Sequence, residues 1–190
     1  MNHLTEQELI AQYINGNDRA FEILVYQHKD KIFTSIYLLV KDKHLAEDIF
    51  QETFVKVIDK LKNEKYTEEG KFAQWLMRIA HNLCMDHFRR TKSRTFINTN
   101  VDESALERIL FASEAANFNI ERHQSHGTVR KLLDLLPEKQ REVVILRHYA
   151  NMSFSEIAQL TKCSINTALG QMRYALINLR KMVEEKELVL

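Results

Sequence analysis

Three sets of polar side chains have residue types and spacings that could carry chemistry or bind a ligand. The first is a set of metal-ligating types, His81, Cys84 and His87, at i, i+3 and i+6. On a helix these positions cover about a third of the circumference, and three ligands from one helix rarely close a tetrahedral zinc site. No fourth ligand is evident. We therefore expect a buried apolar thiol at Cys84, and neither a metal nor another cofactor.

The second set contains paired carboxylates. Asp48 and Glu52 lie one turn apart on one face of an expected helix, together with Gln51 and Lys56. A solvated surface is the simplest interpretation of such a face. The chain has no phosphate-binding loop, no nucleophile elbow and no HExxH pattern. We therefore expect a protein that is not an enzyme.

The third set is a basic helix end. Asn82, Asp86, Arg89 and Arg90 are followed closely by Lys92 and lie near aromatic residues. Such an end can hold phosphates and the splayed bases of a single strand. The alternative is that the basic residues only complement the helix dipole.

The elements that carry these side chains are predicted to be helices. The 190 residues include four glycines and one proline, which favours an all-α fold. Thr5 and Glu8 form a capping box that opens the first helix. Apolar periodicity then predicts helices over about Arg19–Val40, Leu45–Leu61 and Lys71–Arg90. We expect two small helical domains, over residues 1–92 and 127–190. A flexible linker, 93–126, would join them and contain one short helix near Glu103–Ala116.

The C-terminal segment has the pattern of a helix-turn-helix, which offers its second helix to the DNA major groove. Pro137 suits the first position of a helix, and Ser153 with Glu156 forms a capping box. Lys162 stands at the turn, where a glycine is usual. Ser164 or Asn166 can cap the last helix. Its predicted inner residues are Ala168, Leu169, Met172, Ala175, Leu176 and Leu179. Those expected to point outward are Gln171, Arg173, Tyr174 and Arg180.

Charge is distributed unevenly along the chain. Residues 1–92 carry 14 basic and 14 acidic side chains, whereas residues 127–190 carry 10 and 7. A surplus of three is a weak electrostatic footprint for an autonomous DNA-binding protein, so a partner is expected to assist. Cys84 and Cys163 are distant in sequence, which fits a reducing cytoplasm. Neither a signal peptide nor a membrane-spanning segment is evident.

In order along the chain, FEILVYQHKDKIF, HLAEDIFQETFVKVID, FAQWLMRIAHNLCMDHFRR and LPEKQREVVILR with its helix-turn-helix resemble an extracytoplasmic-function (ECF) sigma factor of the sigma-70 family. The resemblance implies a bacterial specificity subunit that brings core RNA polymerase to promoter DNA. It implies that the first domain docks on the clamp helices of the largest subunit. The residues that match the docking motif are Asp48, Gln51, Glu52 and Phe54, with a core position as the alternative for Phe54.

The same resemblance assigns promoter contacts. Asn82 would contact a flipped base of the minus-ten element, with Asp86, Arg89 and Arg90 near the strand. Trp75 is expected in the core rather than as a melting wedge. The second domain would pack on the flap of the second-largest subunit and recognise the minus-thirty-five element. The residues expected to contact that element are Asn166, Thr167, Gln171, Arg173 and Tyr174.

This chain departs from the family at the recognition helix, because Leu169 and Gln171 replace residues that are usually basic. An anti-sigma factor is a further candidate partner. The alternative function is a stand-alone helix-turn-helix regulator that binds duplex DNA as a dimer.

Overall fold

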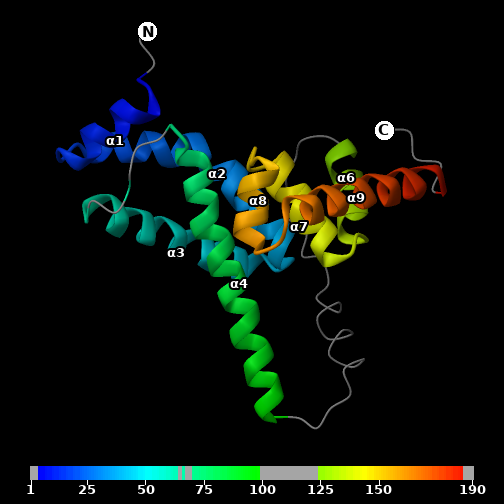
Figure 1. The fold of residues 1–190 in the computed structure, drawn as a ribbon. Helices are drawn as coiled ribbons and strands as arrows, with labels where there is room; N and C mark the ends of the chain where they lie inside the picture. Colours follow the sequence, from blue (N-terminus) through cyan, green and yellow to red (C-terminus); the bar gives the residue numbers. More distant parts are fainter. Residues whose placement is uncertain (1–3, 64–65, 67–69, 99–123, 186–190) are drawn as a thin grey trace. The chain divides into compact units, whose positions relative to one another are not determined.

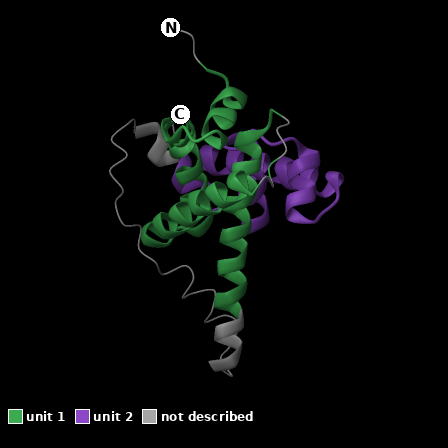
Figure 2. Ribbon diagram, turned by 90° about the vertical axis from the view of Figure 1, so that its left-hand side faces the viewer, with its two compact units in different colours: residues 1–117 green, residues 118–190 purple. Residues whose placement is uncertain are grey.

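The computed structural model describes residues 4–63, 66, 70–98 and 124–185. Within these residues it contains eight helices and no strand, which confirms the all-α prediction (Figure 1). The chain divides into two compact units, residues 1–117 and 118–190 (Figure 2). The short helix expected near Glu103–Ala116 lies outside the described residues.

Unit 1 is a bundle of four helices, α1 (Glu6–Ile14), α2 (Asp18–Val40), α3 (Lys43–Lys62) and α4 (Phe72–Asn98). The capping box of α1 is present, because the Thr5 hydroxyl accepts from the Glu8 N–H and the Glu8 carboxylate accepts from the Thr5 N–H. Asp42 caps α3 by accepting from the Leu45 N–H. These caps satisfy backbone donors that the first turn of a helix leaves unpaired. They explain why the two helices begin within two residues of the predicted positions.

The core of unit 1 lies where α1, α2, α3 and α4 pack together. Its largest fully buried apolar side chains are Leu9, Leu24, Ile36, Leu61, Phe72, Leu76 and Met77. A chain of aromatic contacts extends this core. The ring of Tyr13 stacks on that of Phe21, and the ring of Phe54 makes edge contacts with both Phe21 and Phe50. Trp75 is half-buried against Tyr66 and Phe72, so it packs in the bundle as expected.

Helix α4 is longer than predicted. The sequence indicated an end near Arg90, but the helix continues to Asn98, past the other helices of unit 1 (Figure 1). The apolar stripe stops at the edge of the bundle, whereas Thr91 continues local pairing by donating to the His87 carbonyl oxygen. Apolar periodicity marks the packed part of a helix and not its full length.

Unit 2 consists of α6 (Gln124–Asp134), α7 (Glu138–His148), α8 (Phe154–Thr161) and α9 (Ile165–Glu185). Pro137 stands at the N-cap of α7, one position before the predicted one. The buried centre is formed by Ile145, Leu146, Met152, Ile157, Ala168 and Ala175. Helix α9 packs mainly on α7 and α8. A hydrogen bond of 2.8 Å from the Asn178 amide to Gln140 joins α9 to α7.

Candidate nucleic-acid and protein interfaces

The outward face of α3 presents the predicted carboxylates to solvent. Asp48, Gln51 and Glu52 are all exposed, and their spacing of three and four residues places them on one face of the helix. Glu52 pairs with Lys56 at 3.1 Å. An exposed pair of this kind contributes little to stability. The polar face is therefore not needed to hold α3 in the bundle.

Phe54 does not lie on this face. Its side chain is 8% exposed and packs against the rings of Phe50 and Phe21. The structure thus places Phe54 in the core, which was the alternative to a contact with polymerase. Val55, one residue later, is 65% exposed. It lies seven residues after Asp48 and shares the α3 face, a position that the helical period could have identified. We call Asp48, Gln51, Glu52 and Val55 the α3 face.

The second half of α4 presents a mixed polar face. Asn82, Arg89 and Arg90 are exposed and Asp86 is half-buried, while Asp86 and Arg89 form an ion pair one turn apart. Arg78 is also exposed and lies one turn before Asn82, on the same side. Arg78 is not among the predicted contact residues, although its spacing of four residues from Asn82 is visible in the sequence. Asn82 is therefore flanked on both sides by guanidinium groups.

The three α4 residues of metal-ligating type, His81, Cys84 and His87, differ in how deeply they are buried. His81 and Cys84 are buried, whereas His87 is half-buried and its ring contacts Phe88. Burial raises the pKa of the Cys84 thiol to about 12, so the thiol stays protonated at neutral pH. A protonated thiol is neither a nucleophile nor a metal ligand. Within the part of the chain that the structure describes, no cluster of His, Cys, Asp and Glu residues could hold a metal ion.

The turn between α8 and α9 is fixed by two local devices. Ser153 and Glu156 form the predicted capping box at the start of α8. At its end, Lys162 adopts the left-handed conformation with φ 55° and ψ 43°. Its N–H and that of Cys163 both donate to the carbonyl oxygen of Ala158. The turn therefore has the left-handed geometry for which a glycine is usual, with a lysine in its place.

Helix α9 begins with a serine cap. The Ser164 hydroxyl accepts from the Thr167 N–H at 3.0 Å, so Ser164 is the capping residue and not Asn166. Arg173 and Tyr174 are exposed, as predicted for their outward positions, and so are Asn166 and Thr167. Gln171 differs, because it is half-buried on the flank of α9.

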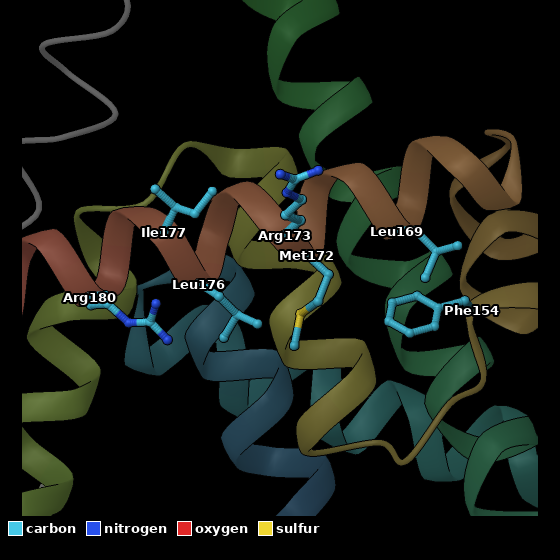
Figure 3. Close-up of a pocket in the computed structure, with 7 residues that line it drawn as sticks. All are labelled: Phe154, Leu169, Met172, Arg173, Leu176, Ile177 and Arg180. Carbon is cyan, nitrogen blue, oxygen red and sulfur yellow. The ribbon is translucent and has the colours of Figure 1, made fainter.

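Leucines on α9 depart from the predicted inward stripe. Leu169 is 44% and Leu176 is 51% exposed, whereas Ala168 and Ala175 are buried. The close approach of α9 to α7 and α8 is made through the two alanines, and the leucines lie at the edge of that contact. They line a groove of about 490 Å³ (Figure 3). Its lining residues are Phe154, Leu169, Met172, Arg173, Leu176, Ile177 and Arg180.

The groove has an apolar floor and a cationic rim. Arg173 and Arg180 contribute two guanidinium groups, and a third, that of Arg147, lies 5.2 Å from the ring centroid of Phe154. Arg147 also donates to the Met152 carbonyl oxygen at 2.8 Å, which fixes the loop before α8. The groove is thus apolar with positive charge at its rim, a composition suited to anionic or amphipathic partners.

The arrangement defines a two-part helical DNA-binding protein, with a helix-turn-helix in one unit and a basic helix in the other. Two family descriptions match the chain: "Sigma-70 region 2" over residues 24–94 and "Sigma-70, region 4" over residues 126–168. The RNA polymerase sigma-H factor of Pseudomonas aeruginosa is 30% identical over 169 residues, which cover 85% of each chain. The ECF RNA polymerase sigma-E factor of Escherichia coli is 28% identical, over 96% of this chain and 94% of its own.

Two solved structures share the fold. CnrH in complex with the cytosolic domain of CnrY has a TM-score of 0.61 and 24% identity, over 93% of this chain and 96% of its own. The sigma factor RpoE of Bartonella quintana, in complex with the anti-sigma factor NepR, has a TM-score of 0.69 and 20% identity, over 86% and 96%.

The chain belongs to the ECF group of the sigma-70 family. It is an alternative sigma factor that directs transcription initiation, and the regulator alternative is not favoured.

Proposed function

We propose that the two units divide promoter recognition between them. Residues 1–92 of unit 1 dock on core RNA polymerase and engage the minus-ten element, and residues 127–190 of unit 2 recognise the minus-thirty-five element. Residues 93–126, which include the end of α4 and the start of α6, connect these two parts. One observation carries this proposal: exposed polar faces on α3 and α4 stand in one chain with an exposed recognition helix. A stand-alone regulator has no use for the first two faces.

The α3 face is proposed to bind the clamp helices of the largest polymerase subunit. Asp48, Gln51 and Glu52 supply acceptors and donors, and Val55 supplies an apolar contact beside them. Phe54 supports this face from the core. An interface of exposed polar groups around an apolar anchor matches the usual anatomy of protein–protein contacts.

The α4 face is proposed to hold the melted minus-ten strand. Asn82 presents an amide that can pair with the edge of a flipped base, and Arg89 and Arg90 supply phosphate contacts. Asp86 orients Arg89 through their ion pair. Flipping a base costs a few kcal/mol, so these contacts must repay the loss of stacking.

The α9 helix is proposed to enter the major groove of the minus-thirty-five element. Asn166, Thr167, Arg173 and Tyr174 are its exposed polar contacts, with Gln171 on the flank. Asn and Gln suit bidentate pairing with adenine, and Arg suits guanine. The flap of the second-largest subunit is proposed to pack on the same unit.

Further partners and location follow the family. We propose that an anti-sigma factor binds the chain, as the anti-sigma factor NepR binds the sigma factor RpoE of Bartonella quintana. Among the described residues, no helix has both the length and the apolar character to cross a membrane. We further propose that the chain acts in the bacterial cytoplasm and has no catalytic chemistry of its own, because the polymerase performs the reaction.

Run-off transcription tests the proposed function. Core polymerase with and without the purified chain is given a pool of genomic fragments from the source organism. Defined start sites that require the chain are the expected result. Duplex binding by the chain alone, without added transcripts, would contradict the proposal and favour the regulator alternative.

A further inference from the structure

Gly170 is a residue that the fold does not explain. Gly16 and Gly70 have φ of 97° and 68°, a backbone conformation that favours glycine. Gly170 instead lies in the interior of α9 without a positive φ. A Cβ built on it would meet nothing within 4 Å among the described residues. Neither backbone conformation nor internal packing therefore requires a glycine at this position.

The glycine also has a cost for the helix. An interior glycine lowers the folding equilibrium constant about two- to fivefold relative to alanine. A glycine that weakens its own helix, and that touches nothing within the chain, is typical of a place where an external surface comes close to the backbone. The face around it supports this interpretation, because Asn166 lies one turn before Gly170 and Arg173 nearly one turn after it.

The charge of α9 indicates what that external surface is. From Ile165 to Arg180 the helix carries Arg173 and Arg180 and no acidic residue, whereas Lys181 near its end pairs with Glu185 at 3.7 Å. This balance is complementary to a phosphate backbone. Because α9 is also the second helix of the helix-turn-helix, the fitting occupant is duplex DNA at its major groove.

The side chains around Gly170 indicate which part of the DNA lies against it. Leu169 directly precedes Gly170, and Ile177 lies two turns after Gly170 on the same side of the helix as the glycine and is 48% exposed. Arg173 and Ile177 point to one edge of α9 and Leu169 to the other, and all three line the groove (Figure 3). A notch the size of one methyl group, with the apolar Leu169 beside it, fits the apolar feature of the major groove, the 5-methyl group of thymine.

We infer that Gly170 forms a notch in the recognition helix that receives a thymine 5-methyl group of the promoter. The notch is defined by Gly170 and the side chains of Asn166, Leu169 and Arg173. The inference rests on the proposed function of α9. Gly170 thereby joins the residues of α9 that determine promoter specificity, and thymine is the base that it selects.

The inference makes a specific prediction about size. The methyl group of alanine at position 170 and the methyl group of thymine would occupy the same volume. Gly170→Ala should therefore weaken binding to the natural promoter. Deoxyuridine, which is thymine without its methyl group, should weaken the wild type about fourfold, the effect of one buried methylene-sized group. The variant should show the reverse preference and bind the deoxyuridine promoter better than the thymine one.

The experiment uses holoenzyme assembled from core polymerase and the full chain. Thymines of the upstream promoter element are replaced one at a time by deoxyuridine, and promoter affinity and run-off transcription are measured for wild type and Gly170→Ala. Gln159→Ala, at an exposed position of α8, is the matched control and should show no change in preference. Thermal unfolding accompanies each variant, because Gly170→Ala should be at least as stable as wild type.

Each outcome has a distinct meaning. A reversed preference at one thymine supports the notch. Normal promoter binding by Gly170→Ala, with every thymine replaceable, overturns it. Weakened binding without any deoxyuridine effect also overturns it and assigns Gly170 to contact with the sugar–phosphate backbone. Weakened assembly with core polymerase before DNA is added shows that a protein surface occupies the notch instead. If the wild type itself starts no transcripts, the proposed function fails, and not the notch alone.

Discussion

At the scale of the residue, the α3 face makes the most direct prediction about polymerase binding. Asp48→Arg reverses a charge on this face, and Val55→Asp places a carboxylate where an apolar contact is proposed. Each change should weaken core polymerase binding about tenfold or more, equivalent to about 1.4 kcal/mol. Both residues are exposed, so stability should stay within about 0.5 kcal/mol of wild type. Fluorescence anisotropy with labelled chain measures the affinity.

Glu22 provides a control for charge reversal. It is an exposed carboxylate on α2 and is not one of the residues of the α3 face. Glu22→Arg should bind core polymerase as the wild type does. Equal loss from Glu22→Arg and Asp48→Arg would indicate long-range electrostatics and not a contact at the α3 face.

The basic end of α4 makes a second prediction at this scale. Replacing Arg89 and Arg90 together by alanine should abolish open-complex formation while core polymerase binding stays intact. The two guanidinium groups are exposed, and the proposed role involves only the melted strand. Permanganate reactivity of unpaired thymines measures melting. A double variant of Arg19 and Lys31, exposed basic residues of α2, should melt promoters normally. Normal melting by the Arg89 and Arg90 variant would remove the α4 face from the proposal.

At the scale of the element, the turn of the helix-turn-helix is strained. Lys162 has φ 55°, a conformation that costs a residue with a Cβ about 1 kcal/mol more than glycine. Lys162→Gly should therefore stabilise unit 2 by about 0.5 kcal/mol, since glycine also gains freedom in the unfolded chain. Lys162→Ala retains the Cβ and should give no gain. Calorimetry of the three proteins tests this, and equal stabilities for the glycine and alanine variants would show that the turn stores no strain.

The contact between His28 of α2 and Glu6 of α1 makes the stability of unit 1 depend on pH. The His28 imidazole is buried, with Nε2 3.0 Å from a carboxylate oxygen of Glu6 and its ring against Phe72. Burial lowers the pKa of His28 below its ordinary value of 6.5, although Glu6 opposes the effect. The folded state therefore holds the imidazole neutral, whereas the unfolded chain takes up a proton below pH 6.5. The contribution of His28 to the free energy of unfolding is therefore complete above pH 6.5, and it decreases as the pH falls below that value.

Fluorescence from Trp75, the single tryptophan, makes this dependence measurable, since it lies in unit 1. Urea unfolding at pH 7.5 and at pH 5.5 should show a loss of stability at the lower pH in the wild type. His28→Gln cannot titrate in this range, so its loss should be smaller. An unchanged loss in His28→Gln would assign the pH dependence to other groups.

Elements and exposed site residues were more predictable than packing details. The caps at Thr5 and Ser153 are local chemistry, and the sequence located both. The outward positions of Asn82 and Arg89 followed from helical period. The apolar pattern predicts Leu169 and Leu176 as interior residues, but in the structure the buried Ala168 and Ala175 make the contact with α7 and α8. Which apolar residues fill a contact depends on how closely the helices approach, and that distance is a tertiary property.

At the scale of the whole molecule, the division of labour between the units predicts how DNA binding depends on polymerase. The second unit has a surplus of only three basic side chains, ten against seven over residues 127–190. Non-specific affinity for duplex DNA comes mainly from phosphate contacts and falls steeply with salt. The chain alone should therefore bind a promoter duplex weakly at physiological salt, with a dissociation constant in the range of about 10⁻⁴–10⁻⁶ M typical of non-specific binding.

Core polymerase should change this behaviour without altering the recognition helix. When the α3 face docks on polymerase, the α4 face and α9 are held to the same promoter, and the second contact becomes intramolecular. Promoter affinity of the holoenzyme should then exceed that of the chain alone by a factor of at least about 100, the lower end for linked contacts. Asp48→Arg should abolish most of that gain while leaving the weak binding of the free chain unchanged. Gel-shift titrations with and without core polymerase measure both affinities. Tight sequence-specific binding by the free chain would contradict the division, because the second unit would then need no partner to recognise its promoter.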